Sequence, residues 1–195
     1  SCYRDRPFRV KSPTEFTAHI QAVRQFLAQG ESLRRTIFLG DANSLVVSTS
    51  HLLPLLEIVH QHFEVALLGG IYAFLDGFNA ERKSPQDYQK LAALGLKRIY
   101  IGLESGSQSL LQFLKKPGSP QEILQAVKVI KAGGVSVGII VLLGAGGQHY
   151  ASEHVAATIK LINAMQLDMD DLIYFSELVE SEEIPYVRDA FQAKL

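Results

Sequence analysis

Carboxylates and small residues stand at the places where apolar runs of this sequence end. Asp41 follows the run 36–40, and Glu104 closes the run 97–104. The residues beside them are polar or small: Gly40, Asn43, Ser105 and Gly106. Carboxylates accept hydrogen bonds from hydroxyl and ammonium groups, and glycines let a ligand approach backbone amides. These residue types predict a cavity for a polar, partly cationic ligand.

Each of these residues also has an ordinary structural explanation. Asp41 and Asn43 could cap a helix or lie in a loop, and Glu104 could bind the free amides of the helix that follows it. A third run, 135–144, ends in the glycine-rich stretch 144–147, which could simply form a turn. The joint placement of these residues after three apolar runs favours a binding site.

The elements that would position these residues follow a regular pattern. Short, almost entirely apolar runs recur at intervals near the ~30 residues of one β–loop–α unit. Such runs are typical of parallel strands that are covered on both faces. The predicted strands are 36–40, 63–70, 97–104, 135–144 and 171–178.

The segments between the runs carry signals for helices. Ser12, Ser84 and Ser119 are each followed by a proline and, three residues after the serine, by an acidic residue. This arrangement is typical of a capped helix start. The predicted helices span about 13–28, 51–61, 85–94, 107–115, 120–132 and 151–165. The glycines expected to end helices are Gly30, Gly95, Gly133 and Gly134.

The alternation of strands and helices predicts an α/β fold, either an open doubly wound sheet or a barrel. The nucleotide-binding fingerprint G-x-G-x-x-G does not follow the first run, which disfavours the doubly wound form. Eight barrel units need ~250 residues, more than the 195 in this sequence. The chain also opens on a loop and a helix. We therefore expect a single domain, 1–195, that forms a partial parallel barrel lacking its first strand.

Composition narrows the classes of function. Hydrophobic residues make up 47% of the chain, enough for a buried core, and the formal net charge of −1 argues against a nucleic-acid partner. One cysteine excludes a disulfide scaffold, and no run is long enough to span a membrane, so we expect a cytoplasmic protein. The start at Ser1 predicts a chain cut from a longer one. The missing strand predicts an exposed sheet edge through which copies self-associate.

Three stretches of the sequence resemble the core of radical S-adenosylmethionine (SAM) enzymes. The most specific is 101–116, IGLESGSQSLLQFLKK. It resembles the fourth-strand segment of the branch that includes tRNA methylthiotransferase-like and Elongator-catalytic-subunit-like proteins. Residues 2–9 are similar to the stretch after the family's cluster-binding cysteines, and 138–154 to its fifth strand and the following loop. The resemblance implies a TIM-barrel-like (β/α)6 core that binds SAM.

The resemblance also implies roles for single residues at the strand ends. Gly40, Asp41 and Asn43 match the place where the family receives the SAM amino group, although the family has two glycines and a glutamate there. Glu104 matches the position whose carboxylate accepts from the ribose hydroxyls. The residues that follow it in the same turn are Ser105 and Gly106.

Three further residues match cofactor contacts of the family. Lys116 matches a basic position that meets the SAM carboxylate, although a solvated lysine is an open alternative. Ile140 lies where family members pack against adenine, and Tyr174 is a second adenine candidate or an ordinary core tyrosine. His154, after the glycine stretch, could contact a substrate or lie at the surface as a helix cap.

The cysteine content departs from the family pattern. Three cysteines, usually spaced C-x3-C-x2-C, hold three irons of a [4Fe–4S] cluster in the family. SAM chelates the fourth iron, and reduction releases a 5′-deoxyadenosyl radical that abstracts hydrogen from a substrate. This sequence contains only Cys2, which matches a neighbour of the cluster rather than a ligand. We therefore expect an inactive chain without metal ligands, whose longer parent holds the cluster and acts as a radical SAM enzyme on an unidentified substrate.

Two explanations of the missing cysteines are open. A longer protein was cut and lost its first strand and cysteine loop, or the chain is a natural degenerate that keeps the barrel for binding. The alternative function is accordingly a non-catalytic TIM-barrel-like domain that binds a nucleoside or another small molecule.

Overall fold

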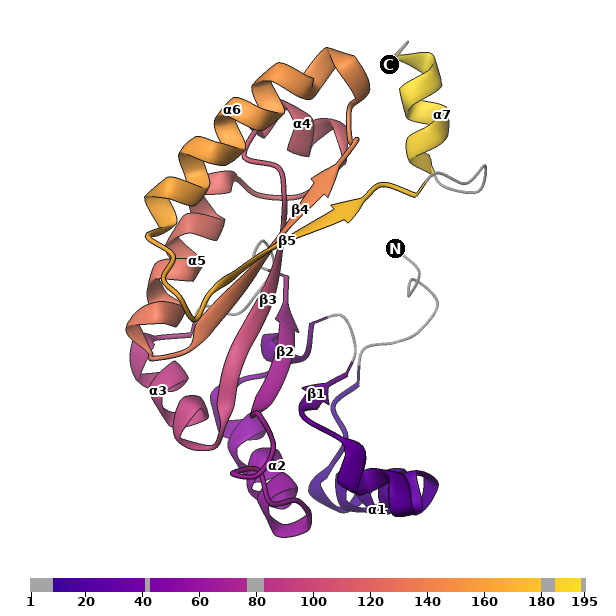
Figure 1. Cartoon of the computed structure of the whole chain (residues 1–195), viewed down its shortest axis with the longest axis vertical. Helices are drawn as coiled ribbons and strands as arrows, with labels where there is room; N and C mark the ends of the chain where they lie inside the picture. The colour runs from indigo at the N-terminus through magenta and orange to yellow at the C-terminus, as the bar shows by residue number, and fades with distance from the viewer. Residues whose placement is uncertain (1–8, 41–42, 77–82, 180–184, 194–195) are drawn as a thin grey trace.

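Five parallel strands form one sheet in the computed structural model of this chain, which describes residues 9–40, 43–76, 83–179 and 185–193 (Figure 1). Each strand pairs with the next one in the sequence. The strands are β1 (Ile37–Leu39), β2 (Ile71–Leu75), β3 (Leu96–Glu104), β4 (Ser136–Leu143) and β5 (Leu172–Glu177).

All six predicted helices are present. They are α1 (Pro13–Leu27), α2 (Thr49–His62), α3 (Pro85–Ala93), α4 (Gln108–Phe113), α5 (Pro120–Ala132) and α6 (Gly147–Met165). Short 3₁₀ helices, η1 (Ala28–Leu33) and η2 (Ser44–Val46), flank β1, and α7 (Pro185–Gln192) follows the sheet. α6 begins earlier than predicted because the left-handed residue Gly146 already completes the turn after β4.

The predicted capping signals work as expected in three helices. In α1, α3 and α5 the serine before the proline accepts from the backbone amide three residues on, and the acidic side chain at that position accepts from the serine amide. The serines are Ser12, Ser84 and Ser119. Reciprocal bonds of this kind satisfy two free amides and fix the residue at which the helix begins.

The strand order distinguishes a barrel from a doubly wound sheet. A doubly wound sheet reverses its order at a switch point, whereas this sheet runs from β1 to β5 without reversal. Right-handed crossovers that all step in one direction place the helices on one face, and Figure 1 shows α3, α5 and α6 along one face of the sheet. The α/β class and the partial parallel barrel are therefore confirmed. Among the described strands β1 pairs only with β2, so its other edge is open.

The predicted strand 63–70 is wrong, and the actual strand, Ile71–Leu75, begins directly after it. Residues 63–70 form the turns that lead from α2 into the sheet, and Leu67 is 80% exposed there. An apolar run alone suggested a strand in this segment. The better signal is the alternation in β2, where Ile71 and Ala73 are fully buried on one face and Phe74 is partly exposed on the other.

The two faces of the sheet carry different side chains. The face toward the helices is aliphatic and buried: on β3 it carries Ile99, Ile101 and Leu103, which pack in one cluster with residues of α5. The opposite face, which we call the inner face, carries the alternate residues of each strand. On β1, β2 and β3 four of these are aromatic: Phe38, Tyr72, Phe74 and Tyr100.

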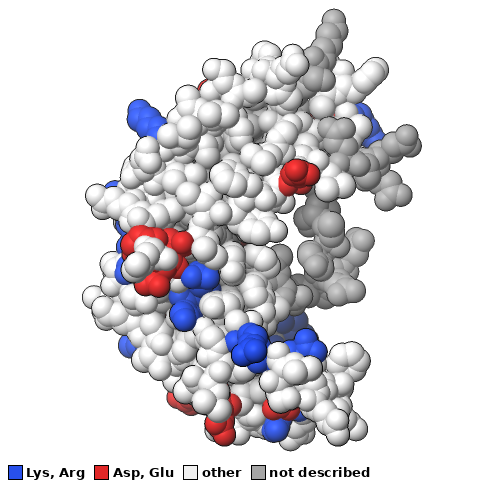
Figure 2. All heavy atoms as spheres, in the orientation of Figure 1, with Lys and Arg blue, Asp and Glu red and all other residues white. Residues whose placement is uncertain are grey.

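Charged side chains are interspersed on the face of the molecule shown in Figure 2, where acidic and basic groups lie mainly over the lower half. Much of the upper half of this view is uncharged. Within the described ranges, no helix combines the length and the apolar character needed to cross a bilayer.

A close helix contact at Gly133 gives the first prediction. A Cβ there would lie 2.3 Å from Tyr88 Cβ and 2.9 Å from the carbonyl oxygen of Pro85, whereas a Cβ at Gly30, inside η1, would meet only Arg34 Nη2, at 3.8 Å. Gly133→Ala should therefore force α3 and α5 apart and lower the free energy of unfolding by about 2 kcal/mol. Gly30→Ala should leave it within about 0.5 kcal/mol. Urea denaturation of both variants checks this, and equal midpoints would contradict it.

Candidate functional site

The carboxyl end of β3 turns sharply at Glu104. Its φ of +60° is left-handed, and the pairing of β3 with β4 shifts register between Gly102 and Glu104. The Ser105 amide donates to the carbonyl of Leu103 at 2.7 Å, which closes the turn. A residue with a side chain rarely adopts this conformation unless its surroundings hold it there. The following contacts show what holds it.

Ser105 is fully buried beneath this turn. Its Oγ lies 2.8 Å from Nδ1 of His154, on α6, and accepts from the Ser107 amide at 3.0 Å. Burial lowers the pKa of His154 below its ordinary value of 6.5, because the charged imidazolium is poorly solvated there. In the tautomer protonated at Nε2, a neutral imidazole accepts a hydrogen bond from the Ser105 hydroxyl at Nδ1, while that hydroxyl accepts from the Ser107 amide.

Gly106 brings the turn into direct contact with the α6 backbone. Its amide donates to Thr158 Oγ1 at 2.9 Å, and a Cβ on Gly106 would lie 2.5 Å from the carbonyl oxygen of Ala157. A helix backbone cannot yield by that distance without losing hydrogen bonds. Glycine at this position is therefore required for α6 to lie against the turn.

A third contact joins the turn to α6. Glu153 accepts from the hydroxyls of Ser107, at 2.7 Å, and of Ser109, at 2.8 Å. These hydrogen bonds lower the pKa of Glu153. Ser107 also caps α4 by accepting from the Leu110 amide. Sequence reasoning missed this cluster, although two serines at the start of a predicted helix were a signal that polar partners were needed.

One of the two oxygens of the Glu104 carboxylate forms an ion pair. Its Oε1 accepts from Nζ of Lys116 at 2.8 Å, in the segment after α4, and the side chains are 16% and 39% exposed, respectively. A Cβ on Gly102 would lie 3.1 Å from the same Oε1, so the carboxylate folds back over this glycine. Glu104 and Lys116 thus place an acceptor and a cationic donor together where β3 ends.

One level below Glu104, a row of inner-face residues crosses three strands. Gly102, Ile140 and Tyr174 are register partners on β3, β4 and β5. Ile140 is partly buried and Tyr174 is 59% exposed. The row therefore offers an apolar side chain and a phenol ring beside a position that carries no side chain. Among the described strands β5 is an edge strand, and the exposure of Tyr174 there does not fit the core-tyrosine alternative.

The carboxyl end of β1 is only partly described. Gly40 is exposed, and a Cβ there would meet nothing within 4 Å. Asn43 Oδ1 accepts from the Asp76 amide at 3.1 Å, which joins the segments after β1 and β2. Asp41 lies outside the described residues. The side-chain oxygen of Asn43 is therefore engaged in the protein, and a role for Gly40 and Asp41 stays a prediction.

The glycine stretch 144–147 forms a turn, as one alternative predicted, whereas His154 is not at the surface. Residues 144–147 form a turn, and the Gly146 amide donates to Tyr186 Oη at 2.9 Å, so this amide already has a partner in α7. His154 is neither at the surface nor a helix cap. It is 7% exposed and bound to Ser105, because α6 turns this residue toward the sheet.

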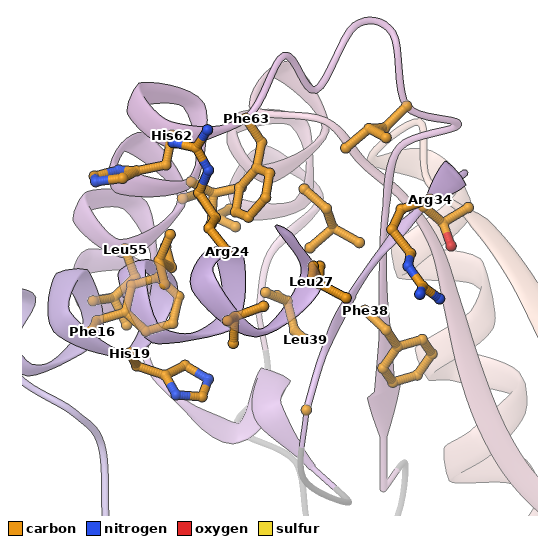
Figure 3. A pocket seen from close by; sticks show the side chains of 18 of the residues that line it. Phe16, His19, Arg24, Leu27, Arg34, Phe38, Leu39, Leu55, His62 and Phe63 are labelled. Carbon is orange, nitrogen blue, oxygen red and sulfur yellow. The ribbon is translucent and has the colours of Figure 1, made fainter. Parts of the chain in front are cut away.

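A large cavity of about 1480 Å³ lies away from Glu104, between α1, β1 and α2 (Figure 3). Its lining includes Phe16 and Leu27 of α1, Phe38 and Leu39 of β1, and Leu55 of α2. The edge of β1 that pairs with no described strand thus lies beside this cavity, which α1 and α2 also line. Among the described residues, no three His, Cys, Asp or Glu side chains are grouped so as to hold a metal ion, and Cys2 lies outside them.

Burial of His154 gives a pH-dependent prediction. Its lowered pKa means that the unfolded chain binds a proton more readily than the folded one, so stability is full above about pH 6.5 and declines as pH falls below it. Urea midpoints between pH 7.5 and 5.5 should fall for the unmodified chain and less for His154→Gln. The exposed His51 serves as the control, since His51→Gln should keep the full decline. Parallel curves for all three proteins would contradict the prediction.

The sequence and the fold of this chain were compared with those of known proteins. The family model of the radical SAM superfamily matches residues 8–162. No curated protein matches the chain. Solved structures that resemble it include Escherichia coli coproporphyrinogen III oxidase HemN, a radical SAM enzyme, with 14% identity and a TM-score of 0.59, over 95% of this chain and 46% of that one.

Two further structures have the same fold. HydG, a maturase of the [FeFe]-hydrogenase, has 12% identity and a TM-score of 0.63, over 94% of this chain and 40% of that one. Elp3 of the archaeon Methanocaldococcus infernus, with an N-terminal deletion, has 12% identity and a TM-score of 0.61, over 92% and 45%. The chain spans less than half the length of each of the three. Since the family match covers most of the sequence and the fold agrees with it, the chain belongs to the radical SAM superfamily.

Proposed function

We propose that this chain is the SAM-binding part of a radical SAM enzyme barrel. The observation that carries the proposal is the turn after β3. There a left-handed Glu104 presents a half-paired carboxylate beside Lys116, directly above the apolar row of Gly102, Ile140 and Tyr174. Ligands of parallel barrels bind at the carboxyl ends of the strands, which is where this turn lies. The segment 101–116 also supports the methylthiotransferase-like and Elongator-like branch as the parent.

The proposed contacts follow from the chemistry of each group. Glu104 Oε1 is occupied by Lys116, but Oε2 can accept from the ribose hydroxyls. Lys116 would share its ammonium protons with the SAM carboxylate. Ile140 and Tyr174 would flank adenine in the space beside Gly102, because a purine buries its faces against apolar and aromatic side chains.

The remaining contacts surround this core of the site. Ser105 and Gly106 would hold the turn through α6 rather than touch the cofactor with their side chains. Gly40, Asp41 and Asn43 would lie near the SAM amino group, because β1 and β3 are parallel and end at the same edge of the sheet.

The residues of this chain do not fit the iron–sulfur cluster that the family implies. A [4Fe–4S] cluster that leaves one iron for SAM needs three thiolates, and this sequence holds one cysteine. We derive no radical step through these residues. Radical chemistry belongs to the proposal only for a longer parent that supplies the thiolates. The single cysteine favours a second candidate function, a non-catalytic barrel that binds a nucleoside.

The edge of β1 that pairs with no described strand could join two copies of the chain. This self-association stays a prediction.

Calorimetric titration with SAM tests the site. Glu104→Ala should weaken SAM binding about tenfold or more, because it removes a hydrogen-bonding carboxylate from the ribose. Asp41→Ala should cost less, since the residue departs from the family motif. Glu57→Ala, an exposed carboxylate on α2, is the matched control and should leave the affinity unchanged. Equal losses for Glu104→Ala and Asp41→Ala would contradict the ranking, and no binding by the unmodified chain would overturn the proposal.

Iron content tests the cluster statement separately. The purified chain should remain colourless and free of iron after anaerobic incubation with ferrous iron and sulfide, because one thiolate cannot hold a cluster. Visible absorbance detects a bound cluster, and iron analysis gives the amount of iron for each chain. A brown, iron-loaded monomer would show that Cys2 has partners among residues of other types.

A further inference from the structure

The inner face carries a continuous group of aromatic rings, Phe38 on β1, Tyr72 and Phe74 on β2, and Tyr100 on β3, which we call the aromatic wall. Ring centroids lie 4.8 Å apart for Phe38 and Phe74, 5.9 Å for Phe74 and Tyr100, and 6.2 Å for Phe38 and Tyr100. Tyr72 meets Tyr100 edge-on at 6.3 Å. These separations are those of interacting aromatic pairs. The wall is therefore one surface rather than four separate side chains.

The rings of the wall are not fully used by the protein. Phe38 is 43% exposed and Phe74 is 38% exposed, although the other face of their strands is partly buried on β1 and fully buried on β2. The interior of a closed parallel barrel is normally filled by branched aliphatic side chains in packed layers. Here the layer is aromatic, and part of its ring surface is open.

Glycine clears the space beside the wall. A Cβ on Gly138 would lie 2.5 Å from Cδ1 and 2.7 Å from Cε1 of Tyr100. The Tyr100 ring therefore lies across the β4 backbone, where any side chain would displace it. Gly102, the inner-face position after Tyr100 on β3, also carries no side chain. The wall thus continues across β4 as a broad, shallow surface instead of being interrupted by a ridge.

Among the described residues of this surface, charge lies only at its two ends. At its lower end Arg98 lies over the Tyr72 ring at 5.7 Å, and its Nη2 donates to the carbonyl oxygen of Asp170 at 2.6 Å, whereas its Nε is buried without a hydrogen-bond partner in the described part of the chain. At its upper end stands Glu104, paired with Lys116. The described inner-face positions between these levels carry aromatic, aliphatic or glycine residues: Phe74, Tyr100, Gly102, Gly138, Ile140, Leu172 and Tyr174.

We propose that the aromatic wall binds a planar, uncharged aromatic ring, which is the part of the substrate that this chain recognises. Open ring faces favour a flat apolar partner, and the described inner-face residues between Arg98 and Glu104, which are uncharged, disfavour an ionic one. The assignment of this ring to a substrate rests on the proposed function, because the wall lies one level below the row proposed for the cofactor. Binding of the ring itself does not depend on SAM.

Indole is the probe that tests the wall. Titration into the 195-residue chain, followed by the methyl NMR signals of Ile140, should give saturable shifts with a dissociation constant on the order of 1 mM, as expected for a ligand of this size. Cyclohexanol, which is apolar but not flat, should bind at least about fivefold more weakly. Uridine, which is flat but needs several hydrogen-bond partners, should also bind more weakly. Indole and cyclohexanol binding equally well would overturn the proposal.

Substitutions locate the binding to the wall. Phe74→Leu and Tyr100→Leu should each weaken indole binding about fivefold, the loss of one aromatic contact. Phe26→Leu removes an equally large ring from the exposed surface of α1 and should leave the affinity unchanged. Equal effects of all three variants would overturn the assignment. If a wall variant does not fold, the comparison of indole with cyclohexanol on the unmodified chain still decides the matter.

The two proposals fail in different ways. Glu104→Ala should lose SAM binding but keep indole binding, because the carboxylate does not contact the wall in this proposal. SAM binding without any saturable indole shift would overturn the aromatic wall alone. Indole binding without SAM binding would overturn the proposed function and leave the wall as an aromatic-binding surface.

Discussion

The docking of the β3 turn onto α6 is the constraint on which the candidate site depends. Three successive residues of the turn each bind this helix: Ser105 through His154, Gly106 through Thr158, and Ser107 through Glu153. His154 and Thr158 lie four positions apart on the buried face of α6, and Glu153 lies beside His154 on the exposed flank of that face. These contacts hold Glu104 in a left-handed conformation that its own side chain disfavours. The position of the carboxylate is thus set by a helix that follows the next strand.

The single-file order of the strands makes the two faces of the sheet unequal. All the crossovers step in one direction, so the helices bury one face and leave the other free. The buried face is aliphatic and is built for packing, as the fully buried Ile99, Ile101 and Leu103 show. The inner face needs no such packing against helices. Helix packing therefore does not restrict the side chains on this face, which can contact a ligand. In this chain they are polar groups at the strand ends and aromatic rings below them.

Local signals explain why much of the fold could be predicted from the sequence. The serine–proline–acid starts of α1, α3 and α5 satisfy backbone amides within four residues, so they need no distant partner. The strand at 63–70 was misplaced because hydrophobic content does not separate a turn from a strand, whereas the alternation in β2 does. Glu104 was found through a motif. The His154–Ser105 bond was not found, because it joins residues 49 positions apart and no local pattern encodes it.

The relation between the two levels of the inner face follows from the register. Phe74, Tyr100 and Gly138 share one row, and Gly102, Ile140 and Tyr174 share the next row toward the carboxyl ends. Adjacent rows on one face of a strand are about 6.6 Å apart, twice the rise per residue. A ring bound on the aromatic wall would therefore lie one row, roughly 6.6 Å, from a nucleoside beside Ile140. Substitution of Gly138 would displace the Tyr100 ring, because a Cβ there would lie 2.5 Å from Cδ1 of that ring. The glycines of β3 and β4 are thus as important to the inner face as the side chains that surround them.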